Sequence, residues 1–298
     1  MMPPAKKFPF ILLLLFSFLG CFLLLPVISI AQGDLLIYPK RLVFDGSKRL
    51  QELNVSNNGN DTARYIISVV EIKMKENGSF EMIDQPEPGQ RFASKNFRFF
   101  PRNVVLGPKE TQVVKVQLYK TGELEPGEYR SHIYLRADKE KKPRGEEKTN
   151  EAATGISIRL EPVFGISIPI IIRVGESTTQ ISLSKVAFQF ENDTIPTLTM
   201  DINRTGNMST YGEISVDYVA LDGKKTRTTS IMDFNTSGKA TRVAFVKGLA
   251  VYTPNTVRHL RLLLDKTAGI DYHSGALHIV YKDESGKIIQ LAQEQIFL

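Results

Sequence analysis

One long run of strand-forming residues, Gly155–Val174, constrains the fold of this chain most. In its first half, Ile156, Ile158 and Leu160 alternate with polar residues, which places the three apolar side chains on one face of a strand. The second half, Ile166–Ile172, is almost continuously β-branched, as expected of a strand buried on both faces. Most strands run for about five or six residues, so this segment is unusually long.

A charged segment, residues 139–148, comes shortly before this run and is typical of a solvated loop. The sequence therefore predicts one strand that begins at an open edge and ends in a core. Two interpretations follow from the residues alone. The strand is either an ordinary central strand after a long hairpin loop, or an edge whose apolar side chains are meant for another protein.

The first residues have the pattern of a secretory signal peptide, which we expect at residues 1–31. Lys6 and Lys7 precede the apolar stretch Phe8–Ile30, and small residues lie just before Gln32. A retained N-terminal anchor and a lipoprotein site at Cys21 are the alternatives. Cleavage would remove the sole cysteine and lower the net charge from +6 to +4, leaving a chain without disulfides or cysteine ligands.

From Leu35 onward, short apolar runs alternate with turns such as Asn57–Asn60 and Glu76–Ser79. Turns at intervals of about 8–12 residues predict an all-β sandwich. Pro39 interrupts an apolar run, which indicates an edge strand or a switch between sheets.

A linker at Gly175–Ser177 separates this series from a second one, so we expect two β-sandwich domains, at 34–174 and 175–298. The strands expected in the second series are Ile181–Phe190, Thr197–Asn203, Gly212–Ala220, Thr226–Ile231, Arg242–Val246, Arg258–Leu264, Gly275–Tyr281 and Ile288–Ile296.

The residues give little sign of catalysis, metal binding or nucleic-acid binding. The positive charge is mild and has no dense basic run, which argues against a nucleic-acid partner. The four histidines have no cysteine or dense carboxylate cluster beside them. No nucleophile elbow, zinc-protease motif or phosphate-binding glycine loop occurs. We therefore expect no catalytic residue, no cofactor and no metal.

Four blocks in order resemble the periplasmic pilus-assembly chaperones, the PapD-like chaperone–usher family. They are Tyr38–Asn57, with its Pro-Lys-Arg and Asp-Gly-Ser segments, then Phe100–Pro108, Gly127–Ser131 and Ile168–Arg173. Together they cover the first β-series, roughly residues 34–174. The second series is similar only weakly, mainly at Ile270–Gly275.

The resemblance implies two immunoglobulin-like sandwiches in a boomerang arrangement, without cofactor or ATP. It implies a periplasmic protein that caps an incomplete fimbrial subunit by donating an edge strand and delivers it to an outer-membrane usher. A self-dimer could cap the edge in the free protein. The residues implied as the donor strand are Ile156, Ile158, Leu160 and Phe164.

The resemblance also implies roles for charged residues. Arg41 corresponds to the arginine that grips the subunit's C-terminal carboxylate, a pairing that suits a guanidinium fork. Where the family has a second cleft cation, this chain has Pro169, which offers neither charge nor N–H. Glu128, Arg173 and Asp271 correspond to a charged trio between the domains. The competing interpretation of the whole chain is a secreted two-domain adhesive or structural module whose long strand is paired internally.

Overall fold

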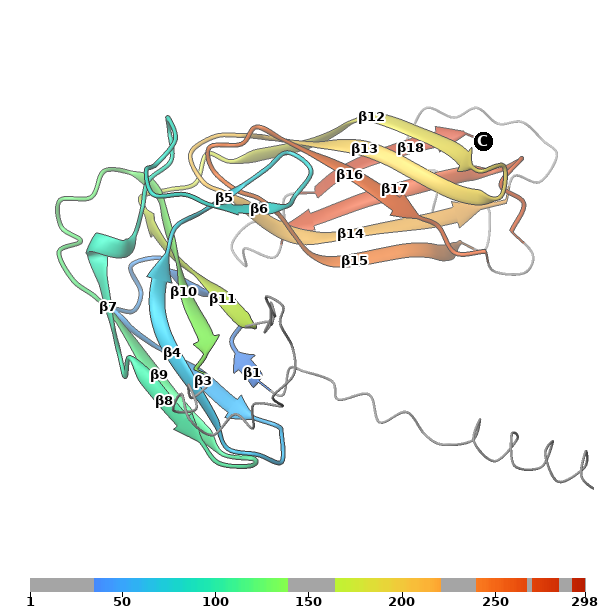
Figure 1. Cartoon of the computed structure of the whole chain (residues 1–298). Helices are drawn as coiled ribbons and strands as arrows, with labels where there is room; N and C mark the ends of the chain where they lie inside the picture. Colours follow the sequence, from blue (N-terminus) through green and yellow to red (C-terminus); the bar gives the residue numbers. More distant parts are fainter. Residues whose placement is uncertain (1–34, 139–163, 221–239, 267–269, 284–290, 298) are drawn as a thin grey trace, which may run out of the picture. The chain divides into compact units, whose positions relative to one another are not determined.

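The computed structural model describes residues 35–138, 164–220, 240–266, 270–283 and 291–297 (Figure 1). The expected signal peptide and the first half of the long strand lie outside these residues. The described part is all-β apart from one 3₁₀ turn, η1 (Ser94–Asn96). None of its helices is long and apolar enough to span a membrane.

Two sheets enclose the first hydrophobic core, and we call them together the first sandwich. One sheet has the order β1 (Leu35–Tyr38), β3 (Leu50–Asn57), β9 (Thr111–Leu118), β7 (Phe97–Phe100). The other has the order β2 (Leu42–Phe44), β11 (Gly165–Val174), β10 (Gly127–Ala137), β4 (Ala63–Val70), β8 (Asn103–Leu106). Alternate residues of both sheets meet in this core, with Leu53 and Val116 from the first sheet and Ile133 and Ile170 from the second.

Pro39 lies where the chain passes from one sheet to the other. β1 is the edge strand of the first sheet and pairs with β3, whereas β2 is the edge strand of the second and pairs in parallel with β11. The prediction of an edge strand or a sheet switch at this proline is confirmed on both counts, because proline lacks the N–H that a continuous inner strand would need.

Two further sheets enclose a second core and form the second sandwich. Their orders are β12 (Gln180–Glu191), β13 (Ile195–Thr205), β16 (Val257–Leu263) and β15 (Thr241–Val251), β14 (Thr210–Val219), β17 (Ala276–Asp283), β18 (Leu291–Phe297). Ile202, Val216 and Ile279 are fully buried between them. The expected strands of the second series are found here, except Thr226–Ile231, which lies outside the described residues.

A hairpin of β5 (Ile72–Met74) and β6 (Phe80–Met82) lies between β4 and β7 in the sequence and contacts the second sandwich. Its turn is the predicted Glu76–Ser79 segment, in which the Lys75 amide donates to the Ser79 carbonyl. Met74 is buried against Ala250 and Tyr252 of the second sandwich, and Figure 1 shows the hairpin lying over that sandwich. All described residues belong to one compact unit within Leu35–Leu298.

Candidate functional site

Among the described residues, no strand pairs with part of one edge of β11. On one side it pairs with β10 along its whole length, from Gly165 opposite Arg136 to Val174 opposite Gly127. On the other side it pairs only with β2, at Ile170–Ile172, because β2 is three residues long. From Gly165 to Pro169 no described strand covers that side, and we call this stretch the open edge. An open edge presents backbone N–H and C=O groups to another strand.

The side chains at the open edge continue the core-facing row of β11. Ile168, Ile170 and Ile172 point into the first core, and Phe164 and Ile166 have the same parity. These two are 52% and 37% exposed. The expectation of burial on both faces from Ile166 onward is therefore wrong for the described residues: only Ile170, Ile171 and Ile172 are buried without interruption, because among these residues β2 pairs with that part of the strand alone.

Of the expected donor residues, only Phe164 lies in the described part. Its carbonyl accepts a hydrogen bond from the Ala137 amide at 3.1 Å, so its backbone already continues the β10–β11 ladder. Ile156, Ile158 and Leu160 lie outside the described residues. In the sequence they share the parity of Phe164 and Ile166, and an extension of the strand would place them on the same face.

Arg41 lies at the junction of the two sandwiches. It comes just before Leu42, the β2 residue that pairs with Ile170 of β11. Its guanidinium carbon is 3.5 Å from the centroid of the Tyr211 ring on β14. Such a cation–π contact holds the plane of the guanidinium in one orientation. Tyr211 in turn packs against the cluster of Met74, Ala250 and Tyr252.

Pro169, in the position of the family's second cation, pairs with His132 of β10. His132 is buried and stacks on Tyr252, with 6.1 Å between ring centroids. Burial, and then the positive charge of Arg130, lowers the pKa of His132 to about 3. The imidazole is therefore neutral near pH 7, and it does not replace the missing charge.

Glu128 is at the centre of a buried charge cluster. Its carboxylate accepts hydrogen bonds from Arg130 at 2.7 Å, from Arg173 at 3.3 Å, and from the amide and hydroxyl of Ser209 at 3.0 and 2.6 Å. Burial alone would raise the pKa of Glu128, but the two guanidinium groups and Ser209 lower it below its usual value. Because Ser209 immediately precedes β14, this cluster joins the two sandwiches.

The structure brings Glu128 and Arg173 together, and it places Asp271 elsewhere. The Asp271 carboxylate caps its own turn, accepting hydrogen bonds from the His273 amide at 2.9 Å and the Ser274 hydroxyl at 3.1 Å. In the cluster around Glu128, the remaining partners are Arg130 and Ser209.

Arg130, Ser209, Tyr211 and Tyr252 are the members of this junction that the sequence analysis missed. Arg130 could have been found, because it is two residues from Glu128 and so lies on the same face of the strand. Its guanidinium carbon is 3.6 Å from the centroid of Tyr252. Ser209 and the two tyrosines carry no such signal, since their neighbours lie on distant strands. Within the described residues, no group of three or more His, Cys, Asp or Glu could hold a metal ion.

No family model and no curated protein matches this chain. Among solved structures it is similar to a chaperone–tip adhesin complex of CFA/I fimbriae biogenesis, at 12% identity and a TM-score of 0.42, over 89% of this chain and 98% of that one. It is also similar to the YadV chaperone, at 9% identity and a TM-score of 0.40, over 89% of this chain and 100% of that one.

A third similar structure is the CupB2 chaperone of Pseudomonas aeruginosa, at 14% identity and a TM-score of 0.38, over 88% of this chain and 100% of that one. The three similar structures are thus matched over 88–89% of this chain. At these identities and TM-scores, the matches report a similarity and carry no argument about function.

Proposed function

We propose that this protein is a periplasmic chaperone that caps incomplete fimbrial or related surface-fibre subunits by donating an edge strand. It is a binding protein and not an enzyme. In the proposal, residues 1–31 are a cleaved signal peptide. Residues 34–174 and 175–298 are two immunoglobulin-like domains in a boomerang arrangement, and an outer-membrane usher receives the subunit. These parts follow from the family resemblance of the sequence.

The observation that carries the proposal is the open edge of β11. Strand addition requires unpaired backbone groups beside apolar side chains of one parity. The open edge supplies backbone that pairs with no described strand, and Phe164 and Ile166 are exposed apolar side chains next to it. Ile156, Ile158 and Leu160 would lengthen that row in a bound subunit, with each side chain entering one pocket of the subunit's groove.

Arg41 is the proposed anchor for the subunit's C-terminal carboxylate. Its contact with Tyr211 supports this role, because a guanidinium whose plane is held loses less entropy when it binds a carboxylate. With Pro169 in β11 and a neutral His132 beside it, we expect the anchor to rely on one cation. Strand pairing would then contribute most of the affinity.

The alternative function, a secreted adhesive or structural module, is disfavoured by the same observation. Such a module would cover this strand with one of its own, since an uncovered edge promotes aggregation. In the part of the chain that the structure describes, the edge at Gly165–Pro169 has no covering strand.

Co-purification from the periplasm tests the proposal, with the mature chain as bait. We expect a small β-rich subunit to bind the wild type and to be lost with Ile166→Asp and Ile158→Asp, because a charge cannot enter an apolar pocket without a large desolvation cost. Arg41→Ala should weaken the complex by roughly tenfold, the value of one charge-assisted contact.

Phe100→Asp is the matched control, because Phe100 is 75% exposed on β7, in the other sheet. It should leave subunit binding unchanged. If Ile166→Asp retained the subunit, or if it unfolded the isolated protein, the open edge would belong to this chain's own packing and the proposal would be wrong.

A further inference from the structure

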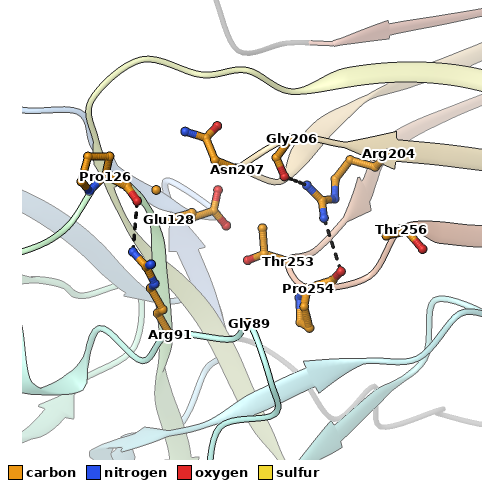
Figure 2. Close-up of a pocket in the computed structure, with 11 residues that line it drawn as sticks. Gly89, Arg91, Pro126, Glu128, Arg204, Gly206, Asn207, Thr253, Pro254 and Thr256 are labelled. Carbon is orange, nitrogen blue, oxygen red and sulfur yellow. Dashed lines mark hydrogen bonds between the residues drawn. The ribbon is translucent and has the colours of Figure 1, made fainter.

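A pocket of about 340 Å³ opens where four loops of the two sandwiches meet (Figure 2). Arg91 and Pro126 line it from the first sandwich, and Arg204, Asn207 and Pro254 from the second. This volume is at the small end of the range for ligand sites, about 300–1,000 Å³. The pocket is separate from the open edge and plays no part in the proposed strand donation.

Arg204 is a buried cation in the wall of this pocket. Within the described residues its side chain donates only to backbone carbonyls: those of Asn255 at 2.8 Å, Gly206 at 2.8 Å and Met208 at 2.9 Å, and more weakly those of Thr205 and Pro254. The residue is 3% exposed, and no carboxylate of the described residues forms an ion pair with it. Burial lowers its pKa from the usual value, but an arginine stays charged in a protein.

The second terminal nitrogen of Arg204 retains donor capacity. Its one hydrogen bond, to the carbonyl of Pro254, is 3.4 Å long, whereas N–H···O bonds are usually about 2.7–3.2 Å. Figure 2 shows the guanidinium pointing toward the Gly206 and Pro254 carbonyls at the pocket. A ligand oxygen at this place would give the nitrogen a better acceptor.

The charges around the pocket favour an anion. Arg91 pairs with the exposed Glu125 at 3.0 Å. Glu128, on the pocket wall, is already shared between Arg130 and Arg173. Four arginines therefore lie in or next to the pocket, Arg91, Arg130, Arg173 and Arg204. The described ion pairs give them two carboxylates, Glu125 and Glu128. The pocket therefore has an excess of positive charge in a partly buried place, where electrostatic attraction is stronger than in water.

The Arg91 guanidinium lies beside the backbone at Pro126 and Gly127. Its first terminal nitrogen donates to the Pro126 carbonyl at 3.0 Å, as Figure 2 shows. Gly127 has φ of +132°, a conformation that L side chains rarely adopt, and a Cβ atom there would make an ordinary contact, 3.4 Å from a terminal nitrogen of Arg91.

We propose that this pocket binds a small oxyanion between Arg204 and Arg91. The ligand is either a free inorganic oxyanion or the carboxylate of a peptide end, since a guanidinium recognises both by charge-assisted hydrogen bonds. The inference goes beyond the proposed chaperone function and does not depend on it.

The test uses the mature protein alone, without any subunit, and follows backbone amide shifts by NMR. Sodium sulfate, N-acetylglycine and neutral N-acetylglycinamide are titrated at constant ionic strength, with chloride as the balancing anion. We expect saturable shifts at the amides of Gly127, Gly206 and Asn207 with sulfate or N-acetylglycine, and none with the neutral amide. The stronger of the two anions identifies the class of ligand.

Arg91→Gln should weaken binding by roughly tenfold, the effect of losing one charge-assisted hydrogen bond, and Arg204→Met should abolish it. If Arg204→Met fails to fold because its loop contacts are lost, Arg91→Gln still decides the outcome. Arg242→Gln is the control of equal charge, because Arg242 pairs with Asp217 in the second sandwich and does not line the pocket. The inference is wrong if the amide shifts do not saturate with either anion, or if wild type and Arg91→Gln bind the anion with equal affinity.

Discussion

Glu128 shows how a single residue can join two sandwiches through charge. A buried carboxylate loses its hydration, and it remains ionised only where other groups replace the water. Arg130, Arg173 and Ser209 do so here, and Ser209 belongs to the second sandwich. The Glu128 side chain is fully buried. If its carboxylate were removed, each of these three partners would lose a hydrogen bond that water does not replace.

Replacing the Glu128 carboxylate should therefore be costly. Glu128→Gln would leave two guanidinium groups without their counter-charge, and we expect the free energy of unfolding in urea to fall by about 3–5 kcal/mol. Glu125→Gln is the control, because Glu125 is 76% exposed in its pair with Arg91, and it should cost less than about 1 kcal/mol. Similar losses in the two variants would contradict a stabilising role for the buried cluster.

At the scale of elements, the β5–β6 hairpin is held to the second sandwich by backbone and side-chain contacts. The His259 amide donates to the Glu76 carbonyl at 2.7 Å. The His259 ring lies between Asp201 on β13, at 2.6 Å, and Glu76 in the hairpin turn, at 3.3 Å. Lys185 on β12 also pairs with Asp201, at 2.9 Å. The histidine thus links the hairpin turn to β13 through two carboxylates.

This geometry predicts that hairpin docking depends on pH. The hydrogen bond to Asp201, with further help from Glu76, raises the pKa of His259 above its usual value of 6.5. A raised pKa means that the stabilisation is complete below the unfolded pKa and is lost as pH rises through the folded pKa. The protection factor of the His259 amide in hydrogen exchange should accordingly fall as pH rises above the usual histidine pKa of 6.5 and through the raised pKa of the folded state.

His259→Gln should remove this pH dependence while leaving the exchange of the second core unchanged. His273→Gln is a suitable control, since His273 stacks on Phe190 at 4.9 Å and lies away from the hairpin contacts. The same pH dependence in wild type and His259→Gln would show that another group controls the docking.

At the scale of the whole molecule, Tyr252 is a side chain of the second sandwich that contacts both the first sandwich and the β5–β6 hairpin. Arg130 and His132 of β10 stack against it, and the ring of Phe80 in the hairpin packs against it at a tilt of 43°, with 5.5 Å between ring centroids. Tyr252 itself follows β15 in the second sandwich and is 8% exposed. Contacts of this kind couple two hydrophobic cores that could otherwise unfold separately.

Truncating this ring should uncouple the two sandwiches. We expect wild-type protein to give one calorimetric transition, and Tyr252→Ala to give two, because the variant removes the packing contacts with Arg130, His132, Phe80 and Met74 at once. Tyr38→Ala, at a tyrosine that is 69% exposed, should keep the single transition. One transition in Tyr252→Ala, merely shifted to lower temperature, would show that other contacts couple the cores.

The sequence by itself determined the strands and turns of the described residues, their order in two β-series, and Pro39 as the place of an edge strand or a switch between sheets. These features depend on neighbouring residues, because strand periodicity and turn chemistry are local. Strand periodicity could have predicted that Glu128 and Arg130 share a face, but it could not have predicted that Ser209 and Tyr252 lie beside them. The tertiary structure alone decided that β2 covers β11 for only three residues, that Pro169 pairs with a neutral His132, and that Asp271 caps its own turn. Each of these outcomes depends on which distant strand becomes a neighbour, and residue periodicity specifies the face of a strand without specifying its partner.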